Sequence, residues 1–162
     1  MSPTRLPTEP FSNVDAAWLH MDEPTNMAMV SGVLTFDAPL DLQRLKDTLT
    51  YRLVPIKRFR QRVKELSLPL TLPRWEPDPT FDLNSHLHRI ALPAPCDEVA
   101  LQELAGDLMS TPLDFTKPLW QMHLVENYRS GSALIVRLHH CMADGRAIHT
   151  VAVVVIGYQR GA

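Results

Sequence analysis

Cysteine is scarce in this sequence. Cys96 and Cys141 are the two cysteines among 162 residues, and they lie too far apart to form a CxxC pair. A zinc site or a redox motif built on closely spaced cysteines is therefore not indicated, and we expect no metal. Such low cysteine usage is typical of a reducing compartment, so we expect a cytoplasmic location.

Long apolar runs are missing as well. The longest covers about residues 147–158, whereas a helix needs roughly 20 apolar residues to cross a bilayer. Residues 1–10 contain three prolines and lack the apolar stretch of a signal peptide. We therefore expect neither a membrane anchor nor a signal peptide.

Neither sign of charge is in large excess. A formal net charge of -2 gives the chain no global attraction for nucleic acid or for an anionic membrane. We predict no nucleic-acid partner, and a peripheral contact with a membrane or a lipid inclusion would require a local patch. The composition, 45% hydrophobic and 21% charged, is that of a folded domain. We expect one domain over residues 1–162, with residues 1–11 flexible.

Helical and strand patterns alternate along the chain. Helices are predicted after the capping residues Ser12 and Asp41 and over residues 99–108. Strands are predicted over residues 27–36, 58–65, 74–76, 86–92, 118–126 and 133–139. Residues 146–156 fit either a helix or a buried strand, because their valines are β-branched. This order predicts an α/β sandwich with a mixed sheet and helices packed on it.

One predicted strand carries alternating basic residues. Arg58, Arg60, Arg62 and Lys64 share one parity, so they would lie on one face of a strand over residues 58–65. Such a face could attract the phosphates of CoA or anionic lipid headgroups. An ordinary solvated face is the reading that we favour.

Two adjacent histidines stand where the last predicted strand ends. They open the segment HHCMADG at residues 139–145. A neutral histidine held at a sheet edge can accept a proton. Gly145 allows a close backbone approach, and Asp144 can orient a neighbour or pair with an arginine. A lone strand-end histidine would simply bind backbone groups, but the complete motif favours a catalytic role.

The same residues carry a family resemblance. Residues 139–145 match the HHxxxDG motif of the CoA-dependent acyltransferase superfamily, which includes chloramphenicol acetyltransferase and the condensation domains of peptide synthetases. The chain resembles in particular the bacterial wax ester synthase/diacylglycerol acyltransferase family over about residues 14–145. Similar segments are residues 15–21, residues 23–27, residues 55–62 and the PLW motif formed by Pro118, Leu119 and Trp120.

The resemblance implies a chloramphenicol-acetyltransferase-like two-layer sandwich and transfer of a fatty acyl group from acyl-CoA to a long-chain alcohol or diacylglycerol. The product would be a wax ester or a triacylglycerol, and no cofactor is implied beyond the acyl-CoA substrate. His140 would be the general base and His139 its packing or hydrogen-bonding neighbour. Asp144 would act structurally, tied to an arginine.

This chain is shorter than the members of the family. Members are more than twice as long and form two similar halves with the reaction tunnel between them. Residues 1–162 therefore resemble the amino-terminal half, and we expect self-association or a complementary carboxy-terminal half. Two alternatives stay open, namely a non-catalytic remnant or binding module of the same fold and a small trimeric enzyme like chloramphenicol acetyltransferase.

Other reactive side chains favour plainer roles. Cys141 is disfavoured as a nucleophile, because adjacent residues of a strand point to opposite sides and no third orienting group is near. His86 and His88 lack an acidic or thiol ligand at metal-binding spacing, so we expect them to be structural. Trp120 is expected to pack in the core rather than to contact substrate.

Overall fold

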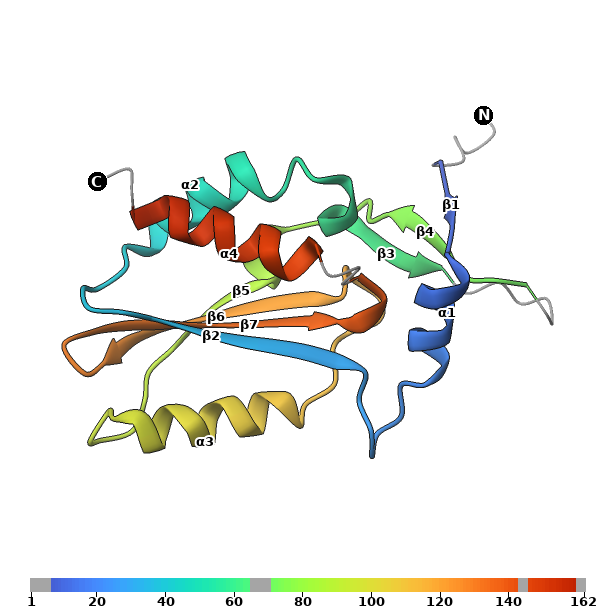
Figure 1. Cartoon of the computed structure of the whole chain (residues 1–162). Coiled ribbons are helices and arrows are strands. Elements are labelled where there is room, and N and C mark those ends of the chain that lie inside the picture. Colours follow the sequence, from blue (N-terminus) through green and yellow to red (C-terminus); the bar gives the residue numbers. More distant parts are fainter. Residues whose placement is uncertain (1–6, 65–70, 143–145, 160–162) are drawn as a thin grey trace.

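A four-stranded sheet lies at the centre of the computed structural model, which describes residues 7–64, 71–142 and 146–159 (Figure 1). Its strands, in the spatial order β2-β7-β6-β5, are β2 (Met29–Phe36), β7 (Gly131–His139), β6 (Trp120–Tyr128) and β5 (Leu87–Ile90). Strand β7 is antiparallel to both of its neighbours, whereas β5 is parallel to β6. The predicted α/β fold with a mixed sheet is confirmed.

Helices cover both faces of this sheet. They are α2 (Leu42–Arg52), α3 (Glu98–Met109) and α4 (Arg146–Gln159), whereas α1 (Asn13–His20) lies beyond one end of the sheet. Figure 1 shows α2 and α4 over one face and α3 over the other. The segment that fitted either a helix or a strand is α4. None of the helices in the part of the chain that the structure describes is long and apolar enough to cross a membrane.

Each of the first three helices begins at a polar cap. The side chain of Ser12 accepts a hydrogen bond from the Asp15 amide at 3.0 Å, and Asp41 accepts one from the Arg44 amide at 2.7 Å. Asp97 does the same for α3. These bonds satisfy amide groups that have no partner inside the helix, which is why the helices begin where the sequence predicts.

The two faces of the sheet bury different side chains. On the α2 and α4 face, Trp120, Met122, Leu134 and Leu138 of strands β6 and β7 lie in the apolar core. The buried hydroxyl of Ser132, near the start of β7 on this face, accepts a hydrogen bond from the Leu40 amide and donates one to the Ala38 carbonyl. On the α3 face, Val125, Ala133 and Ile135 pack with helix residues such as Leu101. Because alternate residues of a strand point to opposite faces, a continuous apolar run such as β7 fills both cores.

A second, three-stranded sheet has the order β1-β4-β3. It consists of β1 (Glu9–Pro10), β4 (Arg74–Pro77) and β3 (Gln61–Lys64), all antiparallel. Phe11 is buried and stacks on Trp75 with ring centroids 4.1 Å apart. The expectation of a flexible start is therefore not met at residues 9–11, because pairing and stacking hold them on this sheet. Residues 1–6 and 65–70 lie outside the described residues.

The predicted basic strand face is wrong. Residues Lys57–Arg60 form a 3-10 turn, η1, so Arg58 and Arg60 precede β3 instead of lying on it. The Phe59 amide donates to the Ile56 carbonyl at 3.0 Å, a local bond that closes the turn and that a strand would not form. Of the remaining two bases, Arg62 and Lys64 both pair with Glu76, at 2.8 and 2.9 Å.

The β6–β7 hairpin is tighter than the sequence suggested. Residues 127–132 read as a linker, but the strands continue to Tyr128 and resume at Gly131. Arg129 adopts a left-handed backbone conformation with φ 51°. A Cβ atom at Gly131 would lie 1.9 Å from the carbonyl oxygen of Phe36, so only glycine fits where the hairpin approaches β2.

Candidate active site

The double histidine lies where β7 meets a short 3-10 turn, η3 (His140–Met142). The backbone amide of His140 donates to the carbonyl of Ala28 at 2.8 Å, which ties the turn to the start of β2. The half-buried ring of His140 stacks on Trp18 of α1, with centroids 4.2 Å apart and planes 15° apart. One strand and one helix therefore fix both the backbone and the ring of this histidine.

His139 is oriented differently and is only 2% exposed. Its Nδ1 accepts a hydrogen bond from the Cys141 amide at 3.1 Å, and its Nε2 lies 3.7 Å from Oδ1 of Asp22. The edge of Phe115 packs on the ring. Burial lowers the pKa of His139, with Asp22 opposing the effect, so the ring is neutral at neutral pH.

The PLW residues form part of the scaffold under the histidines. Pro118, Leu119 and Trp120 are all buried, and the carbonyl of Leu119 accepts a hydrogen bond from the His139 amide at 3.0 Å. Trp120 donates from Nε1 to the carbonyl of Phe59 at 2.9 Å. The motif thus joins the histidine turn to η1, and Trp120 occupies the core as expected.

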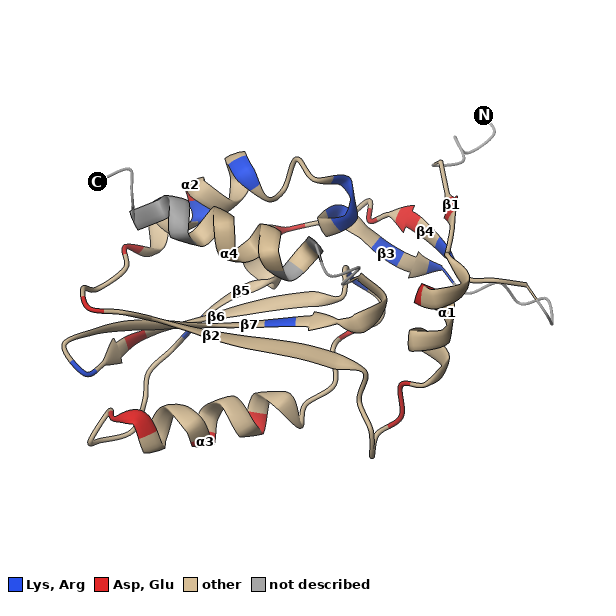
Figure 2. Ribbon diagram, in the orientation of Figure 1, with Lys and Arg blue, Asp and Glu red and all other residues tan. Residues whose placement is uncertain are grey.

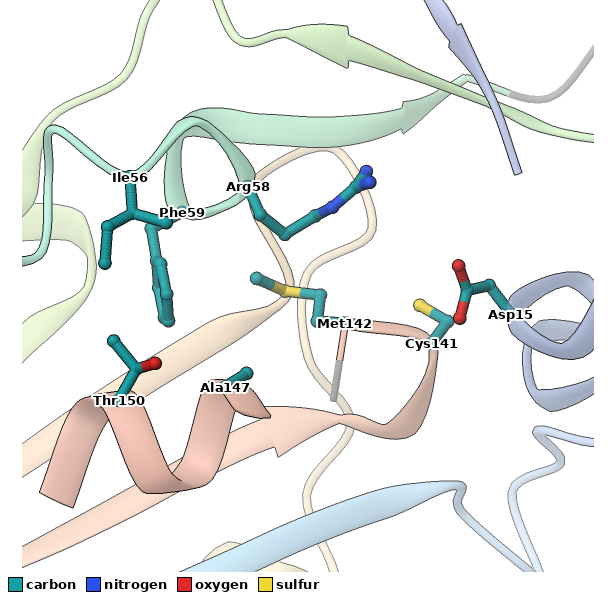
Figure 3. A pocket seen from close by; sticks show the side chains of 8 residues that line it. All are labelled: Asp15, Ile56, Arg58, Phe59, Cys141, Met142, Ala147 and Thr150. Atoms are coloured by element: carbon teal, nitrogen blue, oxygen red, sulfur yellow. The ribbon is translucent and has the colours of Figure 1, made fainter. Parts of the chain in front are cut away.

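A cavity of about 210 Å³ lies beside η3 (Figure 3). Cys141 and Met142 line one side, η1 contributes the opposite side, and α1 and α4 complete it. His140 is not among its lining residues, so the cavity meets the turn from the side of Cys141. Burial raises the pKa of the Cys141 thiol, which keeps it protonated and argues against a nucleophilic role.

Two predicted site residues lie outside this geometry. Asp144 and Gly145 fall between Met142 and the start of α4, outside the described residues. The predicted structural tie of Asp144 to an arginine stays a prediction. Arg58 is an arginine of the cavity lining, and its guanidinium lies over the Trp75 ring, 4.0 Å from the centroid. Figure 2 shows further lysines and arginines on η1 and β3, whereas acidic residues gather on α3.

The two other histidines that the sequence singles out have different partners. His86 follows the 3-10 turn η2 (Leu83–Ser85), hydrogen-bonds through Nδ1 to the Trp120 carbonyl at 2.8 Å and stacks on the indole. His88 is on β5 and lies near His123, with ring centroids 5.2 Å apart. Within the described ranges no group of three or more His, Cys, Asp or Glu side chains could hold a metal ion.

Sequence reasoning missed two neighbours of the histidines, Trp18 and Asp22. Trp18 lies in a segment that resembles the acyltransferase family, residues 15–21, but it reads as an apolar helix residue, and Asp22 reads as a loop acid between that segment and residues 23–27. Each is more than 110 positions from the motif, a separation that no local pattern can bridge. The resemblance of that segment to the same family as the motif was the one available signal.

Comparison with known proteins shows the family to which this chain is similar. The sequence profile of the wax ester synthase/diacylglycerol acyltransferase catalytic domain matches residues 11–157. The probable diacylglycerol O-acyltransferase tgs1 of Mycobacterium tuberculosis is 38% identical over 147 residues, which cover 88% of this chain and 32% of the relative. The probable diacylglycerol O-acyltransferase tgs3 of the same species is 34% identical over 139 residues, covering 83% and 51%.

Solved structures share the fold. The wax ester synthase/diacylglycerol acyltransferase of Marinobacter aquaeolei superposes with a TM-score of 0.74 at 25% identity, covering 90% of this chain and 36% of that one. The starter condensation domain of rhizomide synthetase gives 0.72 at 17% identity, covering 92% and 36%. The chain therefore spans about a third of the length of most of these relatives.

Proposed function

Because the chain belongs to the wax ester synthase/diacylglycerol acyltransferase family, we propose that it carries the general base of an acyl-CoA-dependent O-acyltransferase. The acyl group would pass from acyl-CoA to a long-chain alcohol or diacylglycerol, forming a wax ester or a triacylglycerol. The observation that supports this most directly is the fixed His140 ring at the end of β7, held by Trp18 and by the Ala28 carbonyl.

In this reaction the ring nitrogen of His140 takes the proton of the acceptor hydroxyl. The alcohol oxygen attacks the thioester carbonyl, and the tetrahedral intermediate collapses with release of the CoA thiolate. The protonated His140 then returns the proton to that sulfur, so the base is regenerated. General-base catalysis typically supplies roughly 10²- to 10⁴-fold of rate, and the rest comes from positioning the two substrates and stabilising the oxyanion.

A second half is needed to complete the site in this proposal. The chain spans 32% of tgs1, and its histidine turn contributes only one wall against acyl-CoA and acceptor. We propose that a carboxy-terminal half or a second copy of the chain supplies the other wall. A peripheral contact with a membrane or a lipid inclusion would give this assembly access to its apolar acceptor.

A chimera tests the proposed base. This chain replaces the 32% of tgs1 that it matches, and thiol release from palmitoyl-CoA is measured with a long-chain alcohol or diacylglycerol. We expect His140→Ala to lower the rate by roughly 10²- to 10⁴-fold. His88→Ala, on β5, is the matched control and should leave the rate near the parent value.

Three outcomes would each contradict a part of the proposal. A folded chimera in which His140→Ala keeps the parent rate would remove His140 from proton transfer. A folded chimera that binds acyl-CoA but turns over none of it would favour the non-catalytic binding module. Rapid turnover by the unfused monomer, around 1 to 10³ per second, would show that the chain holds a complete site by itself.

A further inference from the structure

We propose that Asp22 is a positioning residue that holds His139 in its Nε2-protonated tautomer and thereby fixes the turn that carries His140. This inference rests on the proposed function only in taking His140 as the base. The contacts by which Asp22 holds the tautomer of His139, called the tautomer lock below, can be tested without any assay of activity.

The tautomer follows from the hydrogen bond of Cys141. A backbone amide can only donate, so the His139 Nδ1 atom that lies 3.1 Å from the Cys141 nitrogen must offer a lone pair. The proton of the neutral ring is then on Nε2. No described group hydrogen-bonds to that buried nitrogen, and the carboxylate oxygen Oδ1 of Asp22 faces it at 3.7 Å.

Asp22 is placed to favour this arrangement. The side chains of His139 and Asp22 are 3% and 17% exposed, so water screens their interaction little. A carboxylate attracts an N–H dipole and repels a lone pair. The opposite tautomer would turn a lone pair toward Asp22 and would bring the Nδ1 proton against the proton of the Cys141 amide.

The same carboxylate oxygen also holds the backbone beside the turn. Oδ1 of Asp22 accepts a hydrogen bond from the Ala28 amide at 2.6 Å, and the Ala28 carbonyl accepts one from the His140 amide at 2.8 Å. Asp22 therefore acts on two successive amides, that of His140 through Ala28 and that of Cys141 through the His139 ring. Those two amides bracket the Cα of His140 and set the direction of its side chain.

A simpler role for Asp22 would be to cap the loop through Ala28 alone. The two roles differ in what they predict for His139. A loop cap has no effect on the tautomer of that ring or on the Cys141 amide, whereas a tautomer lock controls both.

Nuclear magnetic resonance on the 162-residue chain separates these roles. Long-range proton–nitrogen spectra report which ring nitrogen of each histidine is protonated, and hydrogen exchange reports the amides of residues 28, 140 and 141. The variants are Asp22→Ala, which removes the acceptor, and Asp22→Asn, which keeps a neutral acceptor. Glu23→Ala, at the adjacent exposed acid, is the matched control.

We expect His139 to show the Nε2-protonated pattern in the parent chain, in Glu23→Ala and in Asp22→Asn. In Asp22→Ala the ring should show mixed tautomers, and the amides of His140 and Cys141 should exchange about tenfold faster. If Asp22→Ala speeds exchange at Ala28 alone and leaves His139 and Cys141 unchanged, Asp22 is only a loop cap. An Nδ1-protonated His139 in the parent chain would also overturn the proposal.

The chimera adds a kinetic test. Asp22→Ala should lower kcat about tenfold with little change in KM, because the base is misdirected while substrate binding persists, and Asp22→Asn should recover most of the loss. If His140→Ala proves harmless, the proposed function fails, yet the spectra still decide whether Asp22 locks the tautomer. A lock seen in the spectra together with an unchanged kcat in Asp22→Ala would refute the link between the lock and the base.

Discussion

The two faces of the central sheet differ sharply in polarity. Toward α2 and α4, β6 and β7 present an apolar surface, with Met122, Leu124 and Leu134 at 0% exposure. Toward α3, the same two strands bury His123, Arg137 and His139 together with apolar residues, and Gln121 is half-buried there. Both faces are buried, but most of the buried polar residues of these two strands lie on the α3 face, and Arg137 and His139 lie at the end of β7 that leads into the histidine turn.

The polar residues of the α3 face carry a cost in stability. Four buried polar atoms on the α3 side have no hydrogen-bond partner among the described residues, namely Ser31 Oγ, His123 Nδ1, Arg137 Nε and His139 Nε2. Unpaired buried polar atoms destabilise a fold, whereas the apolar face stabilises it through burial. The comparison suggests that one face of the sheet provides stability and that the other provides the positioning of His140.

The largest effect is expected on the apolar face. Leu134→Ala removes a fully buried side chain from β7 and leaves a cavity, so we expect the free energy of unfolding to fall by about 2–5 kcal/mol. Urea denaturation followed by circular dichroism measures this change. Val33→Ala on β2, where the side chain is 46% exposed, is the control and should cost much less. Equal losses in the two variants would contradict the assignment of stability to this face.

The next effect is expected from acid on the polar face. Burial lowers the pKa of His123 to about 4, with the charges of His88 and Arg137 acting in the same direction. Between about pH 6.5 and pH 4 the unfolded chain binds a proton at this residue that the folded chain does not bind. The free energy of unfolding should therefore fall as the pH is lowered through this window, by on the order of 3 kcal/mol from His123.

Denaturation curves across this pH window test the assignment. His123→Leu should flatten the pH dependence in part, since burial also lowers the pKa values of His86 and His139. His149→Gln, at an exposed position of α4, is the control and should leave the pH dependence unchanged. A His123→Leu variant with the parent slope would show that His123 is not the titrating group.

The sequence predicted local features well and long-range contacts poorly. The helix starts at Ser12 and Asp41 were predictable because a capping bond spans only three residues. The buried run of β7 and the histidine turn after it were predictable for a similar reason. The 3-10 turn η1 was not, because basic residues at alternate positions around a buried Phe59 give the same pattern as a strand with one buried face.

The neighbours of the histidines show the same limit. Trp18 meets His140, and Asp22 faces His139, only after α1 has packed against η3 in the folded chain. The periodicity of apolar residues in the sequence carries no information on contacts between residues more than 110 positions apart. The polarity of the α3 face was hidden too, because the apolar residues that alternate with Arg137 and His139 give β7 the appearance of an ordinary buried strand.

The smallest effect is expected at Arg137, which is 1% exposed and has no carboxylate partner among the residues that the structure describes. Its guanidinium donates to Gln121 Oε1 at 3.1 Å, to the Thr111 carbonyl and to Met29 Sδ. Arg137→Met leaves the half-buried Gln121 amide and the Thr111 carbonyl without this donor, so we expect a loss of about 1–3 kcal/mol in the free energy of unfolding.

The double variant Gln121→Met with Arg137→Met shows whether the hydrogen bond between these two residues stabilises the fold or whether the pair is less favourable than two apolar side chains. Replacing both partners with apolar side chains of similar volume removes the unpaired amide, so the double variant should recover most of the loss seen in Arg137→Met. Urea denaturation of the two single variants and the double variant gives the coupling energy directly. If the two losses simply add, the coupling energy is zero and each side chain stabilises the fold independently of the other, so the contrast between a stabilising face and a positioning face fails at this site. If the double variant is as stable as the parent chain, the polar pair does not contribute to the stability of the fold. Because Arg137 lies two residues before His139, the orientation of the histidine turn is then the property to measure next.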